Sequence, residues 1–198
     1  LTMEELLRAY SAFASGGHLI QPYYIDEVRD RNGEVLETHA IKPFPKVISS
    51  EVATIMTWLL QQVAINGTAA KASRELNVPV GGKTGTTDSQ RDAWFVGFTN
   101  ELVTGTWVGY EKPKNMGAGH TGGVTALPPW IEFMKYATQH YPNRRFPIRG
   151  EIVWANIDEE KGIHVTSGGR GYPFIAGTVP ESSGVAVGQV TAEDLMEL

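Results

Sequence analysis

The chain has 198 residues, which suits one domain, or one domain with a small appendage, and argues against two full domains. Its 22 acidic residues outnumber its 17 basic ones, and the resulting net charge of -5 disfavours binding to nucleic acid. The lack of cysteine excludes disulfides, thiolate zinc sites and a cysteine nucleophile. The chain has no apolar run of about 18 residues, so the sequence predicts no membrane span.

The first part of the sequence predicts two helices separated by a hairpin. A T-x-x-E capping box, Thr2 with Glu5, starts a helix that stops at Gly16. β-Forming residues over 23–38 surround an Asn-Gly pair, which suits the positive φ of a tight turn and predicts a β-hairpin. Apolar residues at helical spacing over 51–66 predict a second helix, capped by one of the two serines before it.

The middle of the sequence predicts an antiparallel meander followed by a third helix. Three β-like stretches lie at 78–87, 93–99 and 102–110, and the two residues between the last pair demand a hairpin. A glycine-rich loop over 117–123 precedes a helix with Pro128 in its first turn. The large aromatic residues of these strands are expected in the core: Trp94, Phe95 and Trp107.

Beyond about residue 145 the pattern changes to short strands separated by proline and glycine, with candidates at 148–157 and 163–166. We therefore expect one domain over 1–145 and a C-terminal tail or appendage over 146–198. The sequence opens directly into a helix signal, so we expect a piece of a longer protein, with any targeting or anchoring segment outside it.

Two glycine motifs and the histidines fail as cofactor or metal sites. The G-K-T at 82–84 ends like a phosphate-binding P-loop, but Asn77 stands where its first glycine is required. The G-x-G-x-x-G pattern from Gly117 follows a hairpin instead of opening a βαβ unit. The five histidines show no i,i+3 or i,i+4 pair for one metal, and only His120 is kept as a cleft candidate. We expect no cofactor and no metal.

A K-T-G triplet, residues 83–85, is the remaining candidate site. In a strand, Lys83 and Gly85 share one face while Thr84 and Thr86 share the other. Glycine lets another backbone approach closely, threonine hydroxyls and a lysine ammonium hold a carboxylate, and a backbone N–H serves an oxyanion. This is the logic of an acyl-transfer site. Three residues alone also suit a plain amphipathic strand, so the surrounding sequence has to decide.

The surrounding sequence resembles one family over nearly the whole chain. The matching segments are G-K-T-G-T-T at 82–87, D-A-W-F-V-G-F at 92–98, W-V-G-Y at 107–110, Gly122-Gly123, Pro129-Trp130, Phe133-Met134, 5–17, the hairpin at 30–35, Gly67-Thr68, Ile157-Asp158, Gly162 and 174–180. They resemble the C-terminal half of the transpeptidase domain of a class A, bifunctional penicillin-binding protein. The resemblance implies an α+β fold of the penicillin-binding and serine β-lactamase type, with a five-stranded antiparallel sheet flanked by helices.

The resemblance also implies a role for each residue of the K-T-G strand. Lys83 would belong to the proton network beside the nucleophile, and Gly85 would keep the strand open to substrate. Thr84 and Thr86 would bind the terminal carboxylate of a D-Ala-D-Ala stem peptide or of a β-lactam, and Thr87 would extend this substrate-binding strand. The Thr86 N–H would form half of the oxyanion hole.

The same family builds its site from S-x-x-K, S-x-N and K-T-G motifs, and the first two are absent from this chain. No serine is followed by lysine at +3 or by asparagine at +2. A Y-x-N variant at 141–143 follows the K-T-G triplet, which is the wrong order for this family. Without an activated serine no acyl-enzyme forms, so we expect this chain alone to be inert.

The implied partner is therefore the N-terminal half of the same transpeptidase domain, in the same polypeptide or in a separate chain. Peptidoglycan stem peptides and β-lactams are the implied ligands. The family works outside the cytoplasmic membrane, so the expected location is periplasmic, with an anchor in a segment that this chain lacks. By analogy, the parent protein would also carry a glycosyltransferase domain.

Two other functions stay open from the sequence. A non-catalytic sensor or scaffold would keep the penicillin-binding fold, and its full-length protein would lack S-x-x-K. A serine β-lactamase-like hydrolase shares the K-T-G strand but needs a water-activating carboxylate and fast deacylation. The long match around 92–110 favours the transpeptidase.

Overall fold

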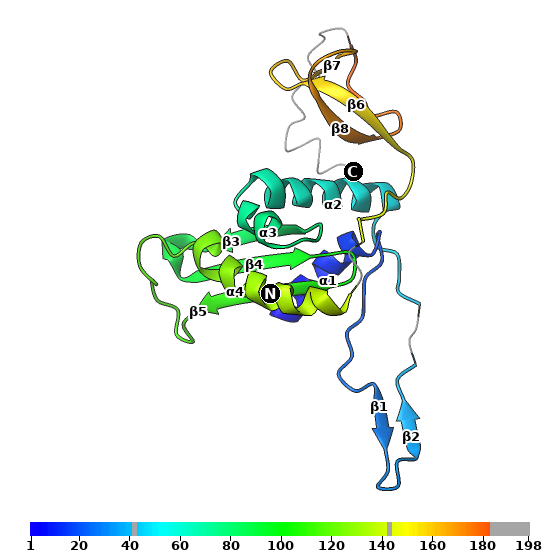
Figure 1. The fold of residues 1–198 in the computed structure, drawn as a ribbon, viewed down its shortest axis with the longest axis vertical. Helices are drawn as coiled ribbons and strands as arrows, with labels where there is room; N and C mark the ends of the chain where they lie inside the picture. Colours follow the sequence, from blue (N-terminus) through cyan, green and yellow to red (C-terminus); the bar gives the residue numbers. More distant parts are fainter. Residues whose placement is uncertain (41–42, 142–143, 183–198) are drawn as a thin grey trace. The chain divides into compact units, whose positions relative to one another are not determined.

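The computed structural model describes residues 1–40, 43–141 and 144–182. It divides into two compact units, Leu1–Pro147 and Ile148–Leu198. In its described residues the first unit contains helices α1 to α4 and strands β1 to β5, and the second contains strands β6 to β8 (Figure 1). Helices and antiparallel sheets are thus combined in an α+β fold, as the sequence predicts.

Helix α1 (Met3–Ala14) begins at the predicted capping box. Thr2 Oγ1 accepts a hydrogen bond from the Glu5 N–H at 3.2 Å, and Glu5 Oε2 accepts one from the Thr2 N–H at 2.7 Å. The bond from the Thr2 N–H is the main reason why the pKa of the Glu5 carboxyl is lowered. The helix ends before Gly16 and Gly17, whose φ values of 77° and 108° lie in the left-handed region.

Strands β1 (Glu27–Arg29) and β2 (Val35–Thr38) form the predicted hairpin. Asp30 Oδ1 closes its turn by accepting hydrogen bonds from the backbone N–H groups of Asn32 and Glu34, both at 2.8 Å. The bond from Glu34 is the largest cause that lowers the pKa of the Asp30 carboxyl. Every residue of both strands is exposed, so side-chain burial contributes little to this hairpin.

Helix α2 (Ser50–Asn66) confirms the second predicted helix, and Ser49 is its cap, because Ser49 Oγ accepts from the Val52 N–H at 3.2 Å. A short helix that the sequence did not predict follows, α3 (Ala70–Glu75). Six residues are too few to show a helical repeat, so its signal is weak. Tertiary contacts hold it instead: Ala72 is fully buried, and Glu75 pairs with Lys135 of α4 at 2.7 Å.

The predicted meander is confirmed by strands β3 (Gly81–Thr86), β4 (Asp92–Phe98) and β5 (Val103–Gly109), which pair antiparallel in that order. Within the described residues this sheet has three strands, whereas the resemblance implies five. β3 and β5 are therefore both edge strands in the part of the chain that the structure describes.

Helices cover both faces of this sheet. Gly97 and Gly105 occupy neighbouring register positions on opposite faces, since Gly97 pairs with Thr104 and Gly105 pairs with Val96. A Cβ at Gly97 would lie 2.7 Å from Trp130 of α4 (Leu127–Ala137), the third predicted helix. A Cβ at Gly105 would lie 2.8 Å from Met3 Sδ of α1. Helix α4 thus packs on one face and α1 on the other (Figure 1).

The prediction that three aromatic residues are buried holds for only one of them fully. Phe95 has no exposed surface and packs edge-on against Trp130, with ring centroids 4.8 Å apart. Trp94 is partly buried, but Trp107 is 40% exposed, which corrects its assignment to the core. Trp107 lies on the outermost described strand, and its indole N–H donates to Asp92 Oδ1 at 2.9 Å. A polar partner at the surface accounts for this position.

The second unit is a three-stranded antiparallel sheet in the order β7-β6-β8, with β6 at Ile152–Asp158, β7 at Ile163–His164 and β8 at Arg170–Ile175. β6 and β7 match predicted strands. β8 was not predicted, because Gly171 and Pro173 interrupt its β pattern. Proline is tolerated there since, in the residues that the structure describes, β8 is an edge strand.

The close packing of α4 on the sheet predicts the effect of a single methyl group. Gly97→Ala would place Cβ 2.7 Å from both Trp130 and Phe95, and overpacking of this kind costs about 1–3 kcal/mol. We expect the urea midpoint of the first unit, followed by near-ultraviolet circular dichroism, to fall. Gly171→Ala is the control, because its Cβ would meet nothing closer than 3.7 Å. Equal midpoints for the two variants would contradict this packing.

Candidate active site

The K-T-G residues lie on β3, whose outer edge has no strand partner among the described residues. The Thr87 N–H donates to the Asp92 carbonyl at 3.1 Å, so the backbone of Thr87 faces β4. Alternate residues of an antiparallel strand direct their N–H and C=O groups toward the partner and away from it. The N–H and C=O of Thr86, and those of Thr84, therefore point away from β4 and toward the open edge.

The side chain of Lys83 lies along this open edge. Lys83 is exposed, and its Nζ donates to the Thr84 carbonyl at 2.8 Å. That bond agrees with the outward direction of the Thr84 carbonyl. A cation is thus held beside the outward backbone groups of β3, without a carboxylate partner among the described residues.

Three threonine hydroxyls gather on the opposite side of β3 from the Lys83 side chain. Thr86 Oγ1 accepts a hydrogen bond from the Gly122 N–H at 3.0 Å, which leaves its own proton free to donate. Thr84 Oγ1 and Thr68 Oγ1 lie 2.8 Å apart, and either can be the donor. One proton of that pair is used between them and one is left over. This hydroxyl row, formed by Thr68, Thr84 and Thr86, can therefore give two hydroxyl protons to one carboxylate.

Thr68 is the member of this row to which the sequence assigned no role. It lies two residues beyond the end of α2, and α2 packs against β3. The Gly67-Thr68 pair matched the family, but nothing in its spacing from Thr84, 16 residues away, predicted that the two hydroxyls meet.

Glycines allow the chain to close over this side of β3. A Cβ at Gly122 would lie 2.5 Å from the Gly85 carbonyl oxygen and 2.4 Å from that of Trp94. Gly122 opens the π-helical turn Gly122–Ala126, which leads into α4. On the other face, which carries Lys83, a Cβ at Gly85 would lie 3.2 Å from Trp94 Cβ, its cross-strand neighbour. The turn thus packs with its backbone directly against the backbones of β3 and β4, beside the hydroxyl row.

Thr87 differs from Thr84 and Thr86, because its hydroxyl both donates and accepts a hydrogen bond with a single residue, Asp92. Thr87 Oγ1 donates to Asp92 Oδ2 at 3.1 Å and accepts from the Asp92 N–H at 2.9 Å. The cleft candidate His120 is exposed, and its Nδ1 lies 3.4 Å from Thr125 Oγ1. Of the Y-x-N variant, Pro142 and Asn143 lie outside the described residues.

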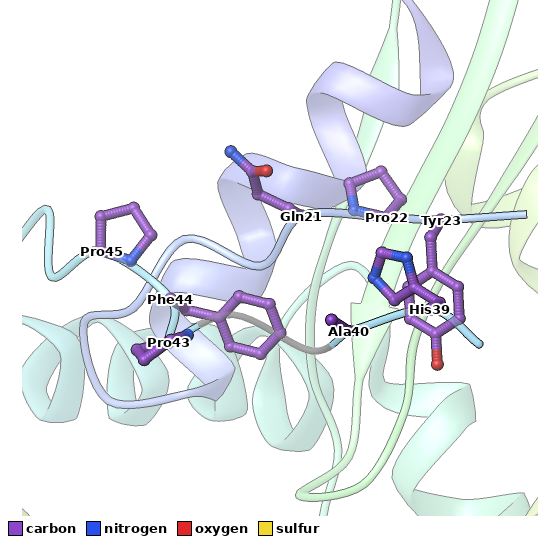
Figure 2. A pocket seen from close by; sticks show the side chains of 8 residues that line it. All are labelled: Gln21, Pro22, Tyr23, His39, Ala40, Pro43, Phe44 and Pro45. Atoms are coloured by element: carbon purple, nitrogen blue, oxygen red, sulfur yellow. The ribbon is translucent and has the colours of Figure 1, made fainter. Parts of the chain in front are cut away.

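Described residues of the first unit also line hollows away from β3. One, of about 270 Å³, is lined by residues on both sides of the hairpin: Gln21, Pro22, Tyr23, His39, Ala40, Pro43, Phe44 and Pro45. Figure 2 shows the Tyr23 and His39 rings stacked at one end of it, with centroids 4.0 Å apart. None of these eight residues belongs to β3. In the part of the chain that the structure describes, no cluster of three or more potential metal ligands occurs.

The second hollow is an apolar groove of about 620 Å³ between α1, the segment 20–24 and the start of β5. Met3, Leu7, Ile20 and Val103 contribute its apolar walls, while Glu4, Arg8 and Glu101 contribute charge. The groove thus adjoins the strand whose outer edge is unpaired among the described residues.

Comparison with known sequences places these observations in a family context. Residues 1–124 match the family described as the penicillin-binding protein transpeptidase domain. Penicillin-binding protein 1A of Aquifex aeolicus (strain VF5) is 39% identical over 182 residues, covering 91% of this chain and 25% of that protein. Penicillin-binding protein 1A of Neisseria gonorrhoeae is 38% identical over 156 residues, covering 77% of this chain and 20% of that protein. The chain spans about a quarter, or less, of these relatives.

Solved structures show the same likeness. The crystal structure of penicillin-binding protein 1A from Haemophilus influenzae aligns with a TM-score of 0.86 and 33% identity, covering 91% of this chain and 32% of that one. The penicillin-binding protein PonA1 from Mycobacterium tuberculosis aligns with a TM-score of 0.62 and 26% identity, covering 73% of this chain and 40% of that one.

Proposed function

We propose, because this chain belongs to the penicillin-binding protein transpeptidase family, that it forms the K-T-G wall of a peptidoglycan D,D-transpeptidase. The observation that carries the proposal is the open edge of β3, where outward backbone groups, a lysine and threonine hydroxyls lie together. The substrate would be a stem peptide that ends in D-Ala-D-Ala, and β-lactams would acylate the same site.

In the proposed reaction a serine oxygen attacks the carbonyl carbon of the penultimate D-Ala. The bond from this carbon to the terminal D-Ala nitrogen breaks, and the nitrogen leaves with a proton. An amine of a second stem peptide then attacks the resulting ester, which releases the serine and forms the cross-link. The attack places negative charge on the carbonyl oxygen in both steps, so a fixed N–H donor lowers both barriers.

The last four residues of β3, 83–86, each have a part in this proposal. The outward N–H of Thr86 would donate to the developing oxyanion. The hydroxyls of Thr84 and Thr86 would bind the terminal carboxylate, and we add Thr68 because its hydroxyl contacts that of Thr84. Lys83 would stand in the proton network beside the serine, and Gly85 would let the extended substrate approach the strand.

The nucleophile must come from outside this chain, because S-x-x-K and S-x-N are absent from it. We propose that the rest of the transpeptidase domain supplies these motifs and seats on β5 and the apolar groove. The chain covers only 25% of the length of the Aquifex aeolicus relative, so most of that protein lies outside the matched region. An unpaired strand edge beside an apolar groove suits an extended segment and a hydrophobic face from that remainder.

We propose a location outside the cytoplasmic membrane, with an anchor elsewhere in the parent protein. Among the described residues, no helix combines the length and the apolar character needed to cross a membrane.

The proposed function predicts where penicillin attaches. In the full-length protein that contains this chain, intact mass spectrometry under denaturing conditions should show one added penicillin, on a serine outside residues 1–198. This chain alone should gain none, because it lacks an activated serine. If the full-length protein takes up no penicillin, a non-catalytic scaffold becomes the better reading. If the adduct forms but is lost within seconds, a β-lactamase-like hydrolase becomes the better interpretation.

The hydroxyl row predicts the effect of two isosteric substitutions. A hydrogen bond to a charged group contributes about 1.5–3 kcal/mol, so Thr84→Val and Thr86→Val should each weaken reversible penicillin binding by about tenfold or more. Stopped-flow acylation of the full-length protein gives this dissociation constant. The methyl ester of the same penicillin should lose nothing, because it has no carboxylate.

Thr106→Val is the matched control for these substitutions. Thr106 lies on β5, is half-buried, and its hydroxyl bonds to no described residue. Equal losses for the ester and the acid, or for Thr106→Val, would contradict a carboxylate site at Thr84 and Thr86.

The apolar groove predicts how the chain associates with the remainder of its protein. When the two parts are produced separately and mixed, Met3→Glu with Val103→Glu should weaken their association at least tenfold, because carboxylates would be buried against an apolar face. Fluorescence anisotropy with a labelled remainder measures the dissociation constant. Ile148→Glu, at a residue 62% exposed in the second unit, is the control. Unchanged binding of the double variant would place the partner elsewhere.

A further inference from the structure

The end of β3 is held by a network of side-chain hydrogen bonds that the proposed reaction does not use directly. Asp92 Oδ2 accepts from the Thr87 hydroxyl at 3.1 Å, and the Asp92 N–H donates back to Thr87 Oγ1 at 2.9 Å. Asp92 Oδ1 accepts from the Trp107 indole N–H at 2.9 Å. The carboxylate of the first residue of β4 thus bonds both to Thr87, which directly follows β3, and to Trp107 of β5.

This network replaces a missing backbone bond. In a regular ladder the Asp92 N–H would donate to the Thr87 carbonyl, because the Thr87 N–H already donates to the Asp92 carbonyl. Here the Thr87 carbonyl accepts from the Gln90 N–H at 3.0 Å instead. The Thr87 hydroxyl takes over as acceptor for Asp92. The last pair of the ladder is therefore closed by a side chain, and the Asp92 carboxylate orients that side chain.

The turn that the network closes is strained. Ser89 and Gln90 have φ values of 58° and 51°, a left-handed conformation that residues other than glycine avoid. Gln90 Oε1 is buried and has no hydrogen-bond partner among the described residues. Such a conformation persists only where the surroundings fix it. If the Asp92 carboxylate were removed, the turn could relax, and the extended end of β3 would relax with it.

The residue next to this network is Thr86. Both peptide groups that flank Thr86 are held by β4. Its N–H shares a peptide with the Gly85 carbonyl, which faces β4 opposite Trp94, and its carbonyl shares a peptide with the Thr87 N–H, which donates to the Asp92 carbonyl. A displacement of Thr87 therefore turns the backbone of Thr86 and changes the direction of its N–H. We infer that Asp92 is a positioning residue for the oxyanion donor of β3, acting through Thr87 and steadied by Trp107. The inference rests on the proposed function. Asp92 touches no substrate; it holds the peptide that follows Thr86 and so steadies the backbone that carries the N–H donor.

A donor that is misdirected affects the transition state more than the first encounter, because the charge appears only during attack. In the full-length protein, Asp92→Ala should therefore lower the rate constant of penicillin acylation at least tenfold. The dissociation constant of the preceding reversible complex should change less than threefold. Trp107→Phe, which keeps an aromatic ring and removes only the indole N–H, should lower the same rate constant by a smaller factor.

Asp88→Ala is the matched control, because it removes the same charge close to Asp92, and the Asp88 side chain forms no hydrogen bond or ion pair with the described residues. It should leave the rate constant unchanged. The amplitude of acylation is proportional to the fraction of the protein that is folded. A variant that folds poorly therefore has a lower amplitude, and its rate constant is still measured on the folded fraction. Backbone amide hydrogen exchange near Thr87 should become faster in Asp92→Ala.

The outcomes separate the two levels of the argument. An acylated wild-type protein together with an unchanged rate constant for Asp92→Ala would overturn the role of Asp92 and leave the proposed function standing. A loss of amplitude alone would also overturn it, since that is the mark of a purely structural residue. A wild-type protein that is never acylated would overturn the proposed function and the inference together.

Discussion

The alternation of hydrogen bonds along β3 is the constraint on which the candidate site depends. Because β3 pairs with β4 alone among the described residues, the backbone groups of every second residue have no strand partner there. The register of the pair decides which residues these are: the Thr87 N–H bonds to Asp92, so Thr86 and Thr84 face outward. A shift by one residue would turn Lys83 and Gly85 outward instead, and would exchange the two faces of the strand.

Packing protects this register. Phe95 and Trp130 fill the space between β4 and α4, and Gly82 and Gly97 leave room for the Phe95 ring, since a Cβ at either would lie 2.7 Å from it. Gly122 lets the turn before α4 rest on Gly85 and bond to Thr86. The strand pair β3–β4 thus contributes both to the hydrophobic core and to the open edge of β3. The packing that fixes the register in the core also fixes which backbone groups face that edge.

The sequence predicts those parts of the fold that local rules control. The capping box of α1, the serine cap of α2, the meander of β3 to β5 and the proline start of α4 all follow from residues within a few positions of one another. Helix α3 and strand β8 escape prediction because the first is too short to show a period and the second carries proline and glycine. The contact of Thr68 with Thr84 and the bonds of Asp92 are set by tertiary packing, which no spacing in the sequence encodes.

The β1–β2 hairpin bears on the solubility of the chain. A two-stranded hairpin has two open edges and is marginal in water, and apolar side chains such as Leu36, 65% exposed, invite pairing with another molecule. Over 26–38, however, five carboxylates (Asp26, Glu27, Asp30, Glu34 and Glu37) outnumber two arginines (Arg29 and Arg31). Two such hairpins repel each other at neutral pH, so the residues that fix its turn and line its edges also keep it from seeding β-aggregation.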